Sequence, residues 1–82
     1  MKLYEFRTKY MTKLALYQPK NDREKELVSE LMIKLNNLRS SKLPSLVFVL
    51  HQIIQYEKVS RDFKDLCRFM LEDIEKLESY EE

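Results

Sequence analysis

The chain has 82 residues, 44% of them apolar and 35% charged, with a formal net charge of only +1, so we expect one small domain that does not bind nucleic acid through bulk electrostatics. It has no glycine, the usual residue at positive φ in hairpin turns and phosphate-binding loops, which argues against all-β folds and nucleotide-binding loops. The single cysteine excludes an internal disulfide, and without a signal-peptide pattern or a run of about 20 apolar residues the chain is expected to be soluble and cytoplasmic.

The first predicted helix covers residues 2–17. Its apolar side chains recur every three or four residues and form one stripe: Leu3, Phe6, Tyr10, Leu14 and Tyr17. Pro19 ends the helix, because the residue before a proline is pushed out of the helical region. The tyrosines of this segment could stack on nucleic-acid bases, but we expect their rings to pack at the edge of the core with the hydroxyl groups reaching water.

The second predicted helix covers residues 21–39. Asn21 is its expected N-cap, since Glu24 stands three residues later and can reach back to complete a capping box. Leucines then follow at heptad-like spacing: Leu27, Leu31, Leu35 and Leu38. Because a leucine zipper needs about three to four heptads, this stripe predicts a seam within a helical bundle.

The third and fourth predicted helices cover residues 44–57 and 60–79. Pro44 lies in the first turn of the third helix, where a missing N–H costs nothing, and Ser60 is the expected N-cap of the fourth. The apolar faces are Leu43, Leu46, Val47, Leu50, Ile53 and Ile54 on the third helix, and Phe63, Leu66, Cys67, Met70, Ile74 and Leu77 on the fourth. Residues 78–82 are expected to be a fraying acidic end. Four helices with short connections predict an all-α, antiparallel up-down-up-down four-helix bundle, formed by residues 1–82 as one domain.

A few large apolar side chains fall outside these core faces. Phe48 points to the polar side of the third helix, near Gln52 and Gln55, and Phe69 does the same on the fourth helix; Ile33 is similar on the second. Exposed apolar side chains mark partner sites when they cluster. We therefore predict a partner-binding surface that contains Phe48, Gln52, Gln55 and Phe69.

Charge is unevenly distributed along the chain. Residues 1–20 contain five basic side chains and one acidic side chain, whereas residues 60–82 contain four basic and eight acidic side chains. This pattern favours the first and last helices as electrostatic neighbours. The alternative is a basic docking face for a membrane or a partner.

The pattern of chemically active residues does not indicate catalysis. His51 and Cys67 are the only histidine and cysteine, and no further ligands are spaced to complete a metal site with them. Cys67 is expected to pack as a small apolar side chain. The acidic residues of the fourth helix are interpreted as a solvated face: Asp62, Asp65, Glu72, Asp73 and Glu75. We predict no catalytic residues, no cofactor and no metal, so the chain is not expected to be an enzyme.

Residues 41–77 resemble the second half of the immunity proteins for pediocin-like (class IIa) bacteriocins, in particular the enterocin A immunity group. In that family a proline-initiated apolar helix leads through a short basic turn to an amphipathic helix with an early aromatic residue and late leucine or isoleucine. The matching residues here are Leu43, Pro44, Leu46, Val47, Leu50 and Tyr56, followed by Phe63, Leu66, Met70, Ile74 and Leu77. Leu27, Leu31 and Leu35 are similar in kind, so the resemblance covers about residues 10–78.

The resemblance implies a cytosolic four-helix bundle that protects a cell from a pore-forming pediocin-like peptide without an enzymatic step. The implied partner is the mannose phosphotransferase permease loaded with bacteriocin, which would bring the protein transiently to the inner face of the membrane. Many family members carry a further C-terminal tail implicated in choosing the bacteriocin, whereas this sequence ends at Glu82. The alternatives are a helical regulatory or assembly adaptor, antitoxin-like or phage-encoded, that acts by homodimerisation, and a nucleic-acid binder that uses the first helix.

Overall fold

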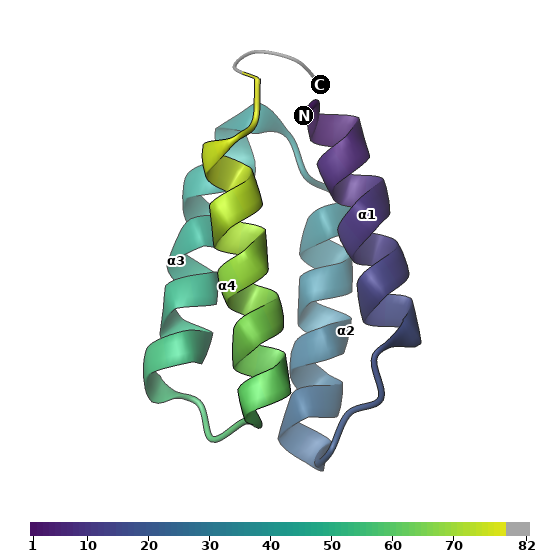
Figure 1. The fold of residues 1–82 in the computed structure, drawn as a ribbon, viewed down its shortest axis with the longest axis vertical. Coiled ribbons are helices and arrows are strands. Elements are labelled where there is room, and N and C mark those ends of the chain that lie inside the picture. Colours follow the sequence, from purple (N-terminus) through teal and green to yellow (C-terminus); the bar gives the residue numbers. More distant parts are fainter. Residues whose placement is uncertain (79–82) are drawn as a thin grey trace.

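The computed structural model describes residues 1–78 of the chain. Over this range it contains four α-helices, one short 3₁₀-helix and no strand: α1 (Leu3–Leu16), α2 (Asp22–Asn36), η1 (Ser40–Lys42), α3 (Leu43–Tyr56) and α4 (Arg61–Glu75) (Figure 1). The predicted all-helical architecture with four helices is therefore confirmed.

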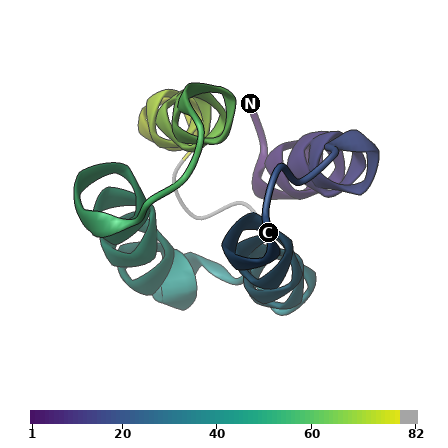
Figure 2. The same cartoon turned by 90° about the horizontal axis from the view of Figure 1, so that it is seen from below.

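The four helices surround a common core. Seen end-on, α1 lies beside both α2 and α4, and α3 lies beside α4 (Figure 2). The α1–α2 and α3–α4 connections lie together at one end of the bundle, and η1 lies at the other end (Figure 1). Two loops that are far apart in the sequence are thus close enough to be joined by side chains.

The helix starts follow the local signals in the sequence. The Asn21 side chain accepts a hydrogen bond from the backbone N–H of Glu24 at 2.8 Å, and the Ser60 hydroxyl accepts one from the backbone N–H of Phe63 at 3.3 Å. Pro44 lies in the first turn of α3, where it removes no helical hydrogen bond. These three predicted helix starts are confirmed.

All four helices end earlier than predicted; the difference is one residue for α1 and α3 and larger for α2 and α4. α2 ends at Asn36 because Asn36 and Asn37 have low helix propensity and the chain then tightens into η1. α4 ends at Glu75. Its predicted end at residue 79 lies outside the described residues, as does most of the predicted acidic end at residues 78–82.

The core is built from the predicted apolar stripes. Its buried apolar side chains are Leu3, Phe6, Tyr10, Leu14, Leu27, Leu31, Leu35, Leu38, Leu46, Leu50, Ile53, Phe63, Cys67 and Met70. Several residues predicted for these faces are only partly buried and pack around the margin of this cluster: Tyr17, Leu43, Ile54, Leu66, Ile74 and Leu77. Val47 is also partly buried.

Ion pairs join α1 and its flanks to α4. Lys9 Nζ lies 2.6 Å from the Asp73 carboxylate, and Lys20 Nζ lies 3.1 Å from that of Asp62. Lys2 and Glu78 form a longer pair at 3.9 Å. The first and last helices are therefore neighbours, as the charge pattern predicts. They run antiparallel, because the partners of Lys2, Lys9 and Lys20 lie at successively lower residue numbers in and around α4. This arrangement neutralises part of the basic charge of α1 and does not favour its use for nucleic-acid binding.

Candidate interaction surface

Three of the four predicted partner residues lie on one side of α3. Phe48 is 63% exposed, and Gln52 and Gln55 are also exposed. On a helix with 3.6 residues per turn, these positions lie opposite the side chains that α3 buries in the core. The predicted outward orientation of all three is confirmed.

Tyr56 extends this surface and was not among the predicted partner residues. It is 74% exposed and stands four residues after Gln52, which itself stands four residues after Phe48. Side chains at this spacing are neighbours on a helix. We call Phe48, Gln52, Gln55 and Tyr56 the α3 strip. The strip has no charged side chain, and its spacing was the sequence signal that could have added Tyr56.

Phe69 lies apart from the α3 strip. It is 56% exposed and lines a hollow of about 520 Å³ between α1 and α4, together with Leu16, Leu66 and Lys13. Leu16 is 76% exposed and falls outside the apolar stripe of its own helix, as Phe69 does. Phe69 therefore contributes to a second apolar surface, on a different pair of helices.

His51 and Cys67 are not brought together. His51 is exposed and lines a hollow between α3 and α4, with Arg68 and Glu72, whereas Cys67 is fully buried in the core. Among residues 1–78, no group of three or more histidine, cysteine, aspartate or glutamate side chains is arranged to hold a metal ion.

The structure predicts that Cys67 is chemically protected in the folded protein. Burial raises the pKa of its thiol to about 12, so the reactive thiolate is scarce at neutral pH. We expect an aromatic disulfide reagent to modify Cys67 rapidly in denaturant and far more slowly without denaturant. The measurement is the release of the reagent's chromophore. Equal rates in the two conditions would show that the thiol is accessible in the folded state.

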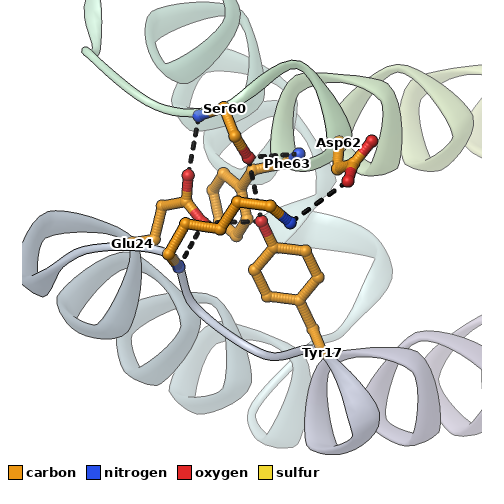
Figure 3. A network of polar contacts seen from close by, with 6 residues as sticks. Tyr17, Glu24, Ser60, Asp62 and Phe63 are labelled. Carbon is orange, nitrogen blue, oxygen red and sulfur yellow. Dashed lines mark hydrogen bonds and ion pairs between the residues drawn. The ribbon is translucent and has the colours of Figure 1, made fainter.

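A buried carboxylate, Glu24, joins the two loops at one end of the bundle (Figure 3). Its side chain is 0% exposed and accepts three hydrogen bonds. The donors are the Tyr17 hydroxyl at 2.5 Å, the Ser60 backbone N–H at 2.6 Å and the Lys20 backbone N–H at 3.0 Å. The Ser60 hydroxyl also lies 3.1 Å from that of Tyr17. Glu24 thus connects the segment before α2 to the start of α4.

Electrostatics keep Glu24 ionised in this position. Burial opposes its ionisation, but the hydrogen bonds from Tyr17, Ser60 and Lys20 outweigh that effect and lower its pKa to about 2. The expected capping box is only half formed, because Asn21 caps α2 while the Glu24 carboxylate bonds to Lys20 and Ser60 instead of Asn21. Glu24 therefore accepts hydrogen bonds that hold the two loops together.

Asp73 forms a second buried polar contact, between α1 and α4. Its carboxylate accepts hydrogen bonds from Lys9 Nζ and from the Tyr10 hydroxyl, both at 2.6 Å. The bonds from Lys9 and Tyr10 hold the pKa of this carboxyl below its usual range, and burial raises the pKa of Tyr10. The interpretation of Asp73 as part of a solvated face is therefore wrong, because that side of α4 faces α1.

The hydroxyls of Tyr10 and Tyr17 were expected to reach water, and that expectation is also wrong. Both donate to buried carboxylates instead, and each partner comes from a different helix. These contacts account for the polar groups in the interior, and no buried side-chain nitrogen or oxygen among the described residues lacks a hydrogen-bond partner. The polar interior therefore serves the fold, and the candidate for function is the exposed α3 strip.

No helix within residues 1–78 is both long and apolar enough to cross a membrane. Comparisons of the chain with protein-family models, with curated proteins and with solved structures find no match.

Proposed function

We propose that this chain is a bacteriocin immunity protein, a non-enzymatic binding module that protects a cell from a pore-forming pediocin-like peptide. Its partner in this proposal is the bacteriocin-loaded mannose phosphotransferase permease. The resemblance of residues 41–77 to that family supports the proposal, as does the four-helix architecture. The observation that carries it is the α3 strip, which presents two exposed aromatic rings on a helix face without charge.

The α3 strip has the composition of a protein-binding surface. Phe48 and Tyr56 supply large apolar areas, and tyrosine is among the residues that dominate binding energy at interfaces. Gln52 and Gln55 can donate and accept hydrogen bonds at the same face. Because the strip carries no charged group, a partner can cover it without the cost of removing charge from water.

The double substitution Phe48→Ser and Tyr56→Ser is expected to abolish protection while leaving the fold intact. Both side chains are largely exposed, so their removal changes the free energy of unfolding by less than about 1 kcal/mol. The measurement is the concentration of each of a panel of pediocin-like peptides that inhibits a sensitive strain expressing the protein.

The matched control is Leu16→Ser with Phe69→Ser, which removes two exposed apolar side chains from the other surface. This variant should protect as well as the unsubstituted protein. If the unsubstituted protein gives no protection against any peptide of the panel, the proposed function is wrong. If the control loses protection and the α3 variant keeps it, the functional surface lies between α1 and α4.

The same α3 strip favours one other candidate, an assembly or regulatory adaptor that dimerises through α3. A symmetric dimer places the same patch of each copy face to face, so an uncharged patch pairs with itself without like-charge repulsion. Sedimentation separates the candidates, because a tight dimer that Phe48→Ser dissociates supports the adaptor, and a monomer at high concentration excludes it.

A further inference from the structure

The end of the bundle that contains η1 carries a basic hollow. It has a volume of about 600 Å³ and is lined by Arg7, Arg39, Lys42, Asn36, Asn37 and Leu38. Among residues 1–78, every charged side chain that lines it is basic. The sequence reinforces this bias, because no acidic residue occurs between Glu30 and Glu57. The hollow brings together side chains from α1, from the end of α2 and from η1 and its flank.

The cations of this hollow are available to a ligand. Arg7 donates from Nη1 to the Leu38 carbonyl at 3.0 Å, and this bond holds the guanidinium in place. The other N–H groups of the guanidinium can donate to a ligand. Arg39 and Lys42 are exposed, and neither forms an ion pair with a carboxylate among residues 1–78. An anion that entered the hollow would therefore not compete with a salt bridge to any carboxylate of residues 1–78.

Two of the other hollows contain acidic side chains. The one between α1 and α4 contains Asp62, which is paired with Lys20, and also Lys13. The one between α3 and α4 contains Glu72 and Glu75 beside Arg68. Carboxylates oppose an anion at both of these places, whereas the described residues that line the basic hollow include no carboxylate.

We propose that the basic hollow binds a phosphate-bearing group through Arg7, Arg39 and Lys42. Guanidinium groups match the geometry of phosphate oxygens with paired N–H donors, and lysine adds a compact charge. The amides of Asn36 and Asn37 can donate further hydrogen bonds. The described residues that line the hollow include no aromatic side chain, so they offer contacts for a phosphate and none for stacking on a base. This site is independent of the proposed immunity function.

The phosphate can belong to a soluble compound or to a lipid headgroup. A smaller hollow of about 180 Å³ between α2 and α3 shares Asn37, Leu38 and Lys42 with the basic hollow and adds Ile33 and Leu46. Ile33 is largely exposed there. These apolar side chains can contact the acyl chain of a lipid, which a soluble phosphate does not have. The experiment therefore tests both sources.

The test titrates the ¹⁵N-labelled protein with inorganic pyrophosphate and follows backbone amide shifts by NMR. Saturable shifts are expected for Asn37, Arg39 and Lys42. The double variant Arg39→Gln with Lys42→Gln should weaken binding at least about 10-fold, since two cationic contacts are lost. The matched control, Lys58→Gln with Arg61→Gln, removes one lysine and one arginine from the opposite end and should bind like the unsubstituted protein.

A second arm uses co-sedimentation with vesicles of phosphatidylglycerol, with phosphatidylcholine vesicles as the reference. Binding only to phosphatidylglycerol vesicles, lost in the Arg39→Gln, Lys42→Gln variant, assigns the site to lipid headgroups. Binding of pyrophosphate without vesicle binding assigns it to soluble phosphates. Absence of binding in both arms overturns the proposal, and so does an equal loss in the two double variants, because general charge would then explain the result.

Discussion

The substitution Glu24→Gln is expected to lower the free energy of unfolding by about 2–3 kcal/mol, because it weakens hydrogen bonds to a buried, ionised acceptor. In the native protein one carboxylate accepts from Tyr17, Lys20 and Ser60. A glutamine has one acceptor oxygen, and its NH₂ group would face N–H donors. For a domain of this size, the loss corresponds to a fall in Tm of roughly 10–20 °C.

Thermal and urea denaturation measure this effect, and two variants make it specific. Glu30→Gln also removes a carboxylate from α2, but its side chain is exposed, so the change should stay within about 0.5 kcal/mol. Tyr17→Phe removes one of the three donors and should cost about 1 kcal/mol. If Glu24→Gln and Glu30→Gln unfold at the same temperature, the carboxylate does not join the loops in solution.

The position of Glu24 shows where prediction from the sequence ends. The spacing of Asn21 and Glu24 correctly indicated the start of α2, because an N-cap depends on residues within one turn. One donor to the Glu24 carboxylate, the backbone N–H of Ser60, lies 36 residues away in the sequence. No local pattern encodes that contact, since it depends on two loops meeting at the same end of the bundle.

The Tyr10 hydroxyl illustrates the same limit on the other side of the core. The apolar stripe of the first helix correctly assigned Tyr10 to the face that meets the core, since periodicity reports which face is buried. Its hydrogen bond to Asp73 spans 63 residues and could not be found in that way. The uneven charge of the two chain ends predicted that α1 and α4 are neighbours, although it did not identify Lys9 and Asp73 as an ion pair between them.

For the surface residues, the sequence predicted which side chains are exposed but not which of them share a surface. Phe48 and Phe69 both lie off the core, as the helical period indicates, because that period assigns each residue to a face of its own helix. Whether two such residues share one surface depends on which neighbouring helix each face meets. Phe69 meets α1, whereas Phe48 faces outward from α3, so the sequence pattern grouped side chains that the fold separates.

Acid should destabilise the protein, with Glu24 as a principal cause. Its pKa falls from 4.5 to about 2 on folding, so the folded state binds protons less readily than the unfolded state. The stability from this shift is fully present above about pH 4.5 and is lost as the pH falls through about 2. At about 1.36 kcal/mol for each pKa unit, it amounts to about 3 kcal/mol. The pKa values of Asp73 and Glu57 are also lowered, so these residues contribute in the same direction.

Urea denaturation between about pH 6 and pH 2 isolates the contribution of Glu24. The difference in unfolding free energy between the unsubstituted protein and Glu24→Gln should be largest near neutral pH and should shrink below about pH 4.5, because protonation makes the two side chains alike in charge. The variant should keep a weaker acid dependence from Asp73 and Glu57, whereas Glu30→Gln should follow the unsubstituted protein throughout. Parallel curves for the unsubstituted protein and Glu24→Gln would show that the pKa of Glu24 is the same in the folded and unfolded states. The carboxylate would then contribute no pH-dependent stability to the two loops that it joins.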